Sequence, residues 1–530
     1  MKITIKTFAL LLMGAATLVS CNKFLDELPD NRAEVDSETK IEKLLVSAYP
    51  ERTYIMIGEM SSDNVDDYGV NNPNTDRFID EVYHWKDQTE SNNESVEAIW
   101  QASYSAIAAA NQALKSIEEL GSTSQAMREA RGEALLCRAY SHFVLVNIFC
   151  KHYNAQTSST DLGIPYMEQV ESTLKPEYQR GTVAEVYQKI ERDVDEALTL
   201  VGETYYEQPK YHFNKKAAFA FASRFFLFYE KWDRAIECAN AVLGTRPDQM
   251  LRDWAAQAAM TQDYEPIVNH YISSTLNCNL MLCTAYSAVG LAFGPYKYYT
   301  RYSHGAYLAN NETGNARNIW GGNPRNDYYS PMKIYSATNL DRTIFWKLPY
   351  LFEEIDPVAG IGFYRTVYPA FTGDETLLNR AEAEIMLKQY DMACEDMTTW
   401  LHNIYKTSYK FTSDNVQKFY SGIDYSYAAA GAMNSTIKKH LHPAFQIDAE
   451  GSVQECMLQA VLQCRRIETL QTGLRWFDVK RYGIEIVRRI MDDKGNPTKL
   501  VDVLPVNDER RAIQLPTKVI SAGIQPNPRN

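Results

Sequence analysis

The sequence predicts an all-α fold in which tetratricopeptide-like helical hairpins support a large irregular, loop-rich region that binds a ligand. Apolar residues recur at helical spacing through most of the chain, and one hairpin motif occurs twice. Two long tracts lose this rhythm and gather aromatic and polar residues instead. Because binding residues concentrate on loops held by a rigid scaffold, these tracts are the expected functional surface.

The amino terminus has the features of an export signal. Two lysines precede an apolar run from Phe8 to Val19, which is too short to cross a bilayer as a permanent helix. The run ends in Leu-Val-Ser followed by Cys21, the pattern of a bacterial lipobox, in which the cysteine is acylated. We expect a signal peptide over residues 1–20 and a mature chain anchored by acyl chains such as palmitate on Cys21. A plain secretory signal with an unmodified cysteine is the alternative.

The charge of the chain disfavours polyanionic partners. Loss of Lys2 and Lys6 with the signal peptide takes the formal charge from −13 to −15. A strongly acidic protein is repelled by nucleic acid and by anionic membrane surfaces, so we expect no nucleic-acid partner. No Gly/Ser linker, charge block or low-complexity tract interrupts the sequence from Phe24 to Ile520, and residues 21–530 are therefore expected to form one body.

The cysteines do not form a disulfide framework. Eight follow Cys21, at irregular spacing and without a C-x-x-C pair. Most lie within apolar helical patterns, which is typical of cysteines that pack as small buried hydrophobes. Export permits disulfides, and a bridge between Cys278 and Cys283 is left open.

The helical scaffold is expected over about 90–250 and 372–485. A stripe of five residues falls at steps of four, three, four and three, and a second helical pattern spans 126–149. The stripe consists of Trp100, Tyr104, Ile107, Asn111 and Leu114. Gly121-Ser-Thr-Ser breaks the two segments into a hairpin, and Thr182 with Glu185 predicts a capping box at the start of a further helix.

Two later segments resemble each other. Trp232-Asp233 matches Tyr390-Asp391, and Ala235 matches Ala393 at the same offset. An aromatic residue at the turn, followed by a small residue where two helices approach, is typical of tetratricopeptide repeats. The irregular tracts lie at about 54–85 and 264–371.

Several blocks of sequence resemble the SusD/RagB nutrient-binding lipoproteins of the Bacteroidota. The resemblance begins at the lipobox and continues through Gly132–Tyr140, Asn214–Ala218 and Leu377–Ala383. Its most specific part is Arg465–Gly483, with Gly-Leu-Arg-Trp-Phe-Asp-Val-Lys-Arg near its end.

The resemblance implies a helical-repeat protein that caps a SusC-like TonB-dependent transporter as a lid at the cell surface. The usual ligands of that family are glycans, and some members take peptides. No catalytic residues are carried over from it. The charged residues Arg475, Asp478 and Arg481, with Trp476, are therefore expected to form a buried ion-pair and packing cluster, because buried charges must be paired.

Glycan binding requires flat aromatic faces beside planar polar groups. Both irregular tracts provide such residues, and we select Trp85 and Trp320 as stacking platforms, with Arg77 and Asn323 as hydrogen-bonding partners. The further candidates for ligand binding are Tyr296, Tyr298 and Asp66. The alternative for any single aromatic residue is that it fills the core.

Other chemistries find weaker support in the sequence. Asp63, Asp66 and Asp67 could bind calcium, but they lack a loop with the required acid spacing, so a solvated turn is favoured and no metal or cofactor is expected. Neither a zinc-protease, a nucleophile-elbow nor a P-loop motif occurs. Neighbouring acids such as Glu353-Glu354 and Asp374-Glu375 do not fix the separation that a glycosidase needs. A non-enzymatic glycan-binding protein is the leading hypothesis; a peptide-binding protein of the same architecture and a surface glycosidase are the alternatives.

Overall fold

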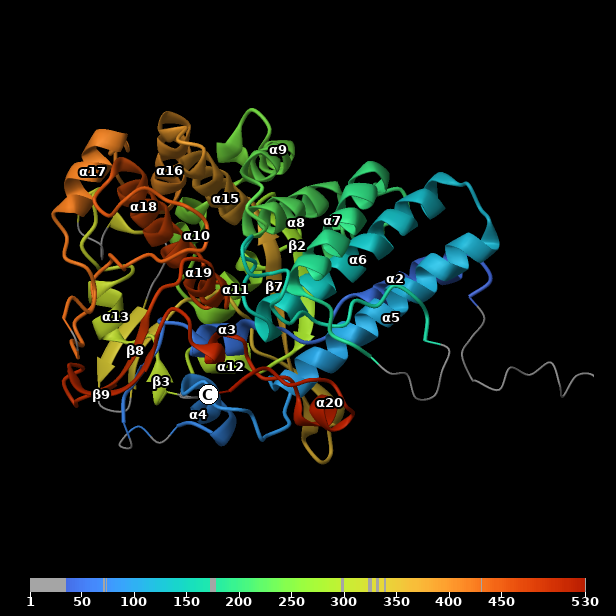
Figure 1. Cartoon of the computed structure of the whole chain (residues 1–530), viewed down its shortest axis with the longest axis horizontal. Helices are drawn as coiled ribbons and strands as arrows, with labels where there is room; N and C mark the ends of the chain where they lie inside the picture. The colour runs from blue at the N-terminus through green and yellow to red at the C-terminus, as the bar shows by residue number, and fades with distance from the viewer. Residues whose placement is uncertain are drawn as a thin grey trace, which may run out of the picture.

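The structure is a computed structural model in which the described residues form a helical layer and three small sheets. It describes residues 35–69, 72, 74–171, 178–296, 300–322, 327–329, 333–337, 340–429 and 431–529. The long paired helices line the upper and right-hand part of Figure 1, whereas the strands and several short helices fill the part below them. The predicted signal peptide and Cys21 lie outside the described residues.

The scaffold consists of helices that pack as antiparallel neighbours. The first group is α2 (Glu38–Leu45), α5 (Val96–Leu120), α6 (Gln125–Phe149), α7 (Val183–Leu200), α8 (Lys215–Phe228) and α9 (Trp232–Leu243). The second group is α15 (Gly373–Met386), α16 (Tyr390–Ile404), α17 (Ser413–Ser421), α18 (Val453–Glu468) and α19 (Arg475–Arg481). Helix α15 packs on α9 as well as on α16, which joins the two groups into one layer.

The predicted helix starts and stops are confirmed. Within the predicted break, Gly121 ends α5 at φ 62° and Ser124 caps α6 by accepting from a backbone N–H of its first turn. Ser95, which the sequence analysis did not select, caps α5 in the same way. Thr182 and Glu185 form the predicted capping box at α7. These caps satisfy N–H groups that the first turn of a helix leaves without partners.

The two similar hairpins share a turn conformation. Glu230, before α9, and Lys388, before α16, adopt left-handed φ values of 61° and 59°. Ala235 and Ala393 are fully buried on the following helices. A left-handed residue costs energy outside glycine, so its recurrence at matching positions supports the similarity that the sequence indicates.

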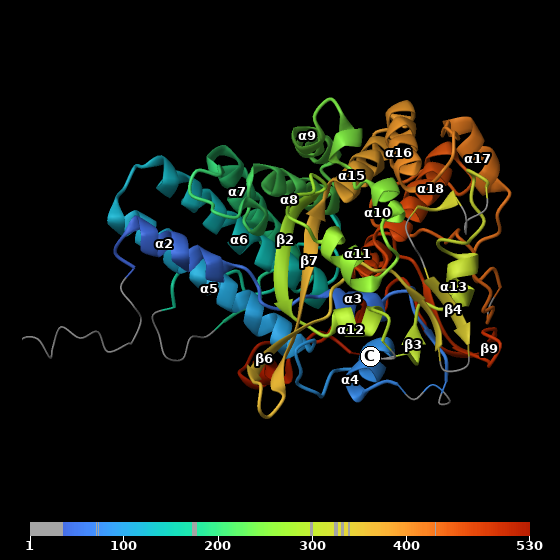
Figure 2. The same ribbon diagram turned by 180° about the vertical axis from the view of Figure 1, so that it is seen from behind.

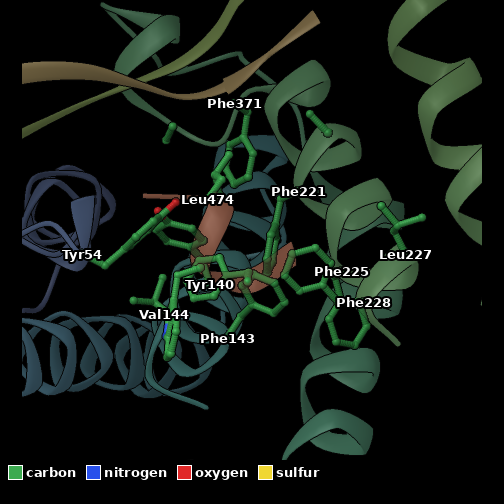
Figure 3. Packing of buried hydrophobic residues seen from close by; sticks show 14 of the residues in the cluster. Tyr54, Tyr140, Phe143, Val144, Phe221, Phe225, Leu227, Phe228, Phe371 and Leu474 are labelled. Carbon is green, nitrogen blue, oxygen red and sulfur yellow. The ribbon is translucent and has the colours of Figure 1, made fainter. Parts of the chain in front are cut away.

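An aromatic cluster at the centre of the molecule joins the helical layer to the sheet. Tyr140 of α6, Phe221 of α8 and Phe371 lie with their ring centroids 5.6 to 5.8 Å apart (Figure 3). All three are buried, and each buried aromatic side chain contributes roughly 1.5–3 kcal/mol to stability. Phe371 belongs to strand β7, so this cluster fixes one end of that strand in the core.

The sequence analysis predicted that the tract from 264 to 371 is irregular. This prediction is wrong, because the tract is built largely from strands and short helices. Its elements are α11 (Tyr264–Tyr271), β2 (Asn279–Tyr286), α12 (Val289–Phe293), β3 (Tyr302–Ser303), α13 (Ala306–Asn311), β4 (Lys333–Ala337), β5 (Leu340–Ile344), β6 (Leu351–Asp356) and β7 (Ile361–Thr372). The pairing of β2 with β7 joins segments far apart in sequence, and such long-range pairing leaves little local signal.

The three sheets are small. The first has the order β2-β7-β6 with antiparallel neighbours, and the second pairs β4 with β5. The third has the order β3-β1-β8-β9 and includes β1 (Asp66–Asp67), β8 (Ile486–Met491) and β9 (Pro497–Leu504). Among the described residues, the remaining α-helices are α3 (Ile55–Ser61), α4 (Arg77–Tyr83), α10 (Trp254–Ala259) and α20 (Thr517–Ser521).

The β6–β7 hairpin projects from the body at the lower edge of Figure 2. Every residue of β6 is exposed, whereas β7 becomes buried toward Phe371. The sheet therefore runs from the molecular core to a free outer edge.

Candidate functional site

Trp85 lies in the interior of the protein. Its indole is 6% exposed, its Nε1 donates to the Ser61 carbonyl at 2.9 Å, and the Arg488 guanidinium lies 4.2 Å from the ring centroid. A ring that is covered in this way has no free face for a sugar. The position of Trp85 is that of a packing residue, in contrast to the platform that the sequence suggested.

Trp320 is also buried. It is 8% exposed, and its ring lies 6.0 to 6.4 Å from those of Trp400, Tyr405 and Phe411. These three edge-to-face contacts are typical of an aromatic core. The structure thus places both predicted tryptophan platforms inside the fold.

Asp66 lies in a buried ion pair and not in a solvated turn. Its carboxylate receives two hydrogen bonds from Arg489, at 2.8 and 3.1 Å. Asp67 pairs with Arg301 in the same way, at 2.9 and 3.1 Å. All three acidic residues predicted to form a solvated turn are at most 4% exposed, because each is matched by arginine.

The third acid, Asp63, lies at the centre of a larger charge network. It accepts two hydrogen bonds from Arg475, at 2.7 and 2.8 Å, and lies 3.4 Å from Arg466. Burial opposes ionisation, but the arginines hold the pKa of Asp63 well below its usual range. Asp478 pairs with Arg465 and Arg481, so the predicted buried ion-pair cluster is confirmed.

The remaining predicted residues are divided between the surface and the undescribed part of the chain. Arg77, on α4, is exposed and pairs with Glu81 of the same helix at 2.9 Å. Tyr298 and Asn323 lie outside the described residues. Tyr296 is 38% exposed and belongs to a line of aromatic side chains.

This line, which we call the tyrosine row, is an extended aromatic feature that reaches the described surface. It comprises Trp346, Tyr264, Tyr296, Tyr350, Tyr364 and Phe352 in that order. Successive ring centroids are separated by 6.3, 6.0, 5.3, 5.7 and 5.5 Å, and no pair is stacked in parallel. Tyr296 and Phe352 are exposed and the other members are half-buried, so the row is open to solvent.

Strand register brings the outer part of the row together. Phe352 of β6 is paired with Tyr364 of β7. Directly paired residues in an antiparallel sheet project from the same face, with their side chains in contact. The hairpin turn between these strands therefore sets the end of the row.

A close backbone approach fixes the middle of the row. A Cβ at Gly290 of α12 would overlap with the carbonyl oxygen of Pro349, the residue before Tyr350. The backbone N–H of Tyr350 donates to the Tyr264 hydroxyl at 3.0 Å, and this hydroxyl donates to the Leu348 carbonyl at 2.8 Å. Glycine therefore permits α12 to lie directly against the segment that carries Tyr350.

Arg342 of β5 holds the loop that carries Tyr296. Its guanidinium donates to the carbonyl oxygens of Ala292, Gly294 and Tyr296. Burial lowers the pKa of Arg342 to about 10, against the opposing effect of Tyr335, so it remains charged at neutral pH. Three charge-assisted hydrogen bonds restrict the movement of this loop.

Polar groups accompany the aromatic faces. Within the described residues, the hydroxyls of Tyr350 and Tyr364 have no hydrogen-bond partner in the protein. The ammonium of Lys333 lies 5.4 Å from the ring centroid of Trp346. The row can therefore offer flat apolar faces together with donors and acceptors.

A cavity beside α5 is a second place that could hold a ligand. It measures about 430 Å³ and lies along α5, opposite α20. Its lining includes Trp100, Tyr104, Tyr178, Asn111 and Gln169. Tyr104 and Asn111 donate to the carbonyls of Pro165 and Met167, so they also hold the neighbouring loop.

Features of metal sites and membrane spans were sought in the described ranges. No group of three or more His, Cys, Asp or Glu side chains there is arranged to hold a metal ion. In the same residues, no helix has the length and apolar character needed to cross a bilayer. The cysteines of the described chain, Cys278 and Cys283 included, are free and buried.

Most of the tyrosine row was missed by the sequence prediction, which selected Tyr296 alone. The available signal was the aromatic and β-branched residues of Leu351–Asp356 and Ile361–Tyr368, two runs separated by Pro-Val-Ala-Gly. That pattern is typical of a β-hairpin, in which alternate residues share one face.

The fold and part of the sequence match known proteins. Residues 23–227 match a SusD-like family model described as "starch-binding associating with outer membrane". A protein of Bacteroides vulgatus superposes on the chain with a TM-score of 0.65 and 17% identity, over 94% of this chain and 99% of its own. No curated protein matches the chain in sequence.

Two further crystal structures have the same fold. A SusD-like carbohydrate binding protein of Bacteroides vulgatus gives a TM-score of 0.59 at 15% identity, over 92% of this chain and 96% of its own. A SusD superfamily protein of Bacteroides thetaiotaomicron gives a TM-score of 0.58 at 18% identity, over 93% of this chain and 100% of its own. Residues 23–227 are therefore similar in sequence to the SusD-like family, and the described chain shares the fold of these SusD-like structures along most of its length.

Proposed function

We propose that this chain is a cell-surface lipoprotein that captures glycans on the tyrosine row and delivers them to a SusC-like TonB-dependent transporter in the outer membrane. The observation that carries the proposal is the row itself, with centroid separations of 5.3 to 6.3 Å. A sugar ring packs its C–H face on an aromatic face, and neighbouring hydroxyls then bond to its oxygen atoms. Successive rings would hold successive units of an oligosaccharide.

The anchor is proposed to be a lipid on Cys21. The description of the matched family, which associates with the outer membrane, supports this location. The lipobox at the end of the apolar run supplies the chemistry, because two or three acyl chains anchor a protein stably. Removal of residues 1–20 would leave residues 21–530 as the mature protein.

The helical layer is proposed to act as a tetratricopeptide-like scaffold. The shared turn at Glu230 and Lys388 supports a common ancestry of the α8–α9 and α15–α16 hairpins. In this proposal the scaffold spans about 90–250 and 372–485, and it holds the 264–371 segment, which carries the tyrosine row. The 54–85 segment, whose candidates Trp85 and Asp66 are buried, contributes no member of the row.

Binding without cleavage is the proposed activity. Glu353 and Glu354 are adjacent on β6 and so project from opposite faces of the strand. Asp374 and Glu375 are buried, and Glu375 is bonded to Arg224. Neither pair is arranged as two carboxylates facing each other across a sugar.

Peptide binding is the second candidate. The cavity along α5 favours it, because a mostly apolar lining with amide groups such as Asn111 and Gln169 also suits a short peptide. A surface glycosidase remains the third candidate and is distinguished by product formation.

These three functions can be distinguished by affinity electrophoresis of the mature protein against plant, fungal and host polysaccharides. Calorimetry with a test for cleavage then follows on any polysaccharide that retards the protein. We expect retardation by at least one polysaccharide, without hydrolysis and with loss of binding in Tyr296→Ala. If Tyr178→Ala abolished the retardation and Tyr296→Ala did not, the glycan-binding site would lie in the cavity along α5. Released reducing sugar would establish an enzyme, and no retardation would favour peptides.

A further inference from the structure

The β6–β7 hairpin is the main concentration of exposed apolar side chains in the described chain. Thirteen large apolar side chains are exposed among the described residues, and six of them lie between Leu351 and Phe363. Val358, at the tip, is 98% exposed, and Ile355 and Ile361 are each 60% exposed. Clustered apolar exposure on one element indicates an interaction surface, because single exposed residues are common but contiguous ones are not.

Strand β6 also presents a free edge. It lies at the end of the β2-β7-β6 sheet, and all six of its residues are exposed. Within the described residues, no backbone hydrogen bond is found on the side of β6 that faces away from β7. An exposed strand edge that carries apolar side chains is a template for the addition of another strand.

The negative charge of the hairpin indicates which kind of partner could bind to the free edge of β6. Three acidic residues, Glu353, Glu354 and Asp356, lie on β6, and one basic residue, Arg365, pairs with Glu353 at 2.6 Å. Addition of a second copy of β6 would bring its acids beside these acids, which is unfavourable. An anionic membrane surface would be repelled as well. The complementary occupant is an extended segment that alternates apolar and basic side chains.

The hairpin is continuous with the tyrosine row. Phe352 and Tyr364 form the end of the row and also lie at the base of the exposed hairpin. A partner bound to the β6 edge would therefore lie beside a ligand held on the row.

We propose that β6 is a docking strand: a protein partner adds an extended, apolar and basic segment to its free edge and so comes to lie at the end of the tyrosine row. The second part of this statement rests on the proposed function, because it requires that the row binds the ligand. The first part depends only on the exposure, edge and charge of the hairpin.

Photo-crosslinking in cells tests the docking strand. Benzoylphenylalanine replaces Val358 in the full-length, membrane-attached chain, and a control chain carries it at Val46, which is 63% exposed on another part of the molecule. We expect a protein adduct from position 358 alone. Mass spectrometry of the adduct should map it to a segment that alternates apolar residues with lysine or arginine.

Charge reversal provides the second measurement. Glu354→Lys should reduce the yield of the adduct at least fivefold, whereas Glu395→Lys, on an exposed position of α16, should leave it unchanged. An adduct with the mass of two copies of this chain, an adduct with lipid, the absence of any adduct, or a protein adduct insensitive to Glu354→Lys would each overturn the proposal.

Glycan binding by the isolated variants separates this inference from the proposed function. Glu354→Lys should bind the polysaccharide as the wild type does, because residue 354 is not in the row. If the wild type binds no glycan but forms the adduct, the docking strand stands and its place beside a ligand falls.

Discussion

The rings of Tyr296 and Tyr350 lie 5.3 Å apart at an angle of 66°, and this contact connects the loop after α12 to the segment that enters β6. It joins the two halves of the tyrosine row, so loss of either ring would interrupt the row in the middle.

Substitution of Tyr296 by alanine should weaken glycan binding by about 1–2 kcal/mol, or roughly 5–30-fold, because it removes an exposed aromatic anchor. Tyr178 is a matched control, since it is 37% exposed but lies in the cavity along α5. Calorimetry of Tyr296→Ala and Tyr178→Ala with the same oligosaccharide measures both. Equal affinities for the two variants would exclude Tyr296 from the site.

Gly290→Ala should displace the backbone that supports the tyrosine row, although Gly290 is not itself a member of the row. The added Cβ would overlap with the Pro349 carbonyl, so either α12 or the segment that carries Tyr350 must shift. We expect a loss of about 1–3 kcal/mol of unfolding free energy, together with weaker glycan binding.

Gly422→Ala provides the control for this substitution. A Cβ added at Gly422 would lie 3.5 Å from its nearest neighbouring atom, and the φ of −92° at this position suits any residue. Urea unfolding should give a change within about 0.5 kcal/mol. Unaltered stability and affinity in Gly290→Ala would argue against the close approach.

Trp320→Ala should act on stability and not directly on the ligand. The indole is buried among Trp400, Tyr405 and Phe411, and truncation of a buried tryptophan costs about 3–5 kcal/mol. Trp346→Ala, in the half-buried end member of the row, should lower affinity more than stability. Denaturant unfolding and calorimetry of both variants test this contrast, and it fails if Trp320→Ala loses affinity at full stability.

His304 should make the protein sensitive to acid. Burial and the nearby Arg466 lower the pKa of His304 to about 4, and its ring bonds the Asn64 carbonyl and the Thr313 hydroxyl at 2.8 Å. The unfolded chain binds this proton below about pH 6.5 and the folded chain only near pH 4. As the pH falls from about 6.5 to 4, protonation of His304 in the unfolded chain therefore lowers the free energy of unfolding by about 1.4 kcal/mol for each pH unit.

A difference measurement isolates this effect from the other titrating groups. The stability advantage of the wild type over His304→Gln should be constant above about pH 7 and should shrink as the pH falls from about 6.5 toward 4. Urea unfolding of both proteins at a series of pH values measures the gap. A gap that does not depend on pH would show that His304 is already exposed to protons in the folded state.

Cys21→Ala should release the protein from the membrane fraction, because the thioether-linked lipid would be absent. Cys278→Ala, which alters a cysteine inside the folded body, should leave the protein membrane-bound. Fractionation with immunoblotting measures both. Retention of Cys21→Ala in the membrane fraction would remove the lipid anchor from the proposal.

The helical scaffold could be predicted from sequence because its signals are local. The stripe from Trp100 to Leu114 lies on α5, and Thr182 with Glu185 forms the capping box that starts α7. Helix caps and helical periodicity involve residues within a few positions of each other, so a single sequence carries them.

The binding surface could be predicted only as a region. The pairing of Tyr286 with Arg365, and the approach of Tyr296 to Tyr350, join segments distant in sequence. The local pattern around Asp63 indicates a solvated turn because its partner, Arg475, lies far along the chain. The chemistry of Trp85 suits a sugar platform, but its burial depends on neighbours that a local pattern does not contain.

Strand β7 has a mechanical consequence. From Phe371 in the core to Ile361 beside the hairpin turn it spans roughly 33 Å, at about 3.3 Å for each residue. Its inner part is held firmly, because Phe371 lies between α6 and α8 and residues 365–372 pair with β2, while the outer end extends into solvent. A force applied to the hairpin tip would therefore be transmitted along β7 to the aromatic cluster at the helical layer, where the side chains are closely packed.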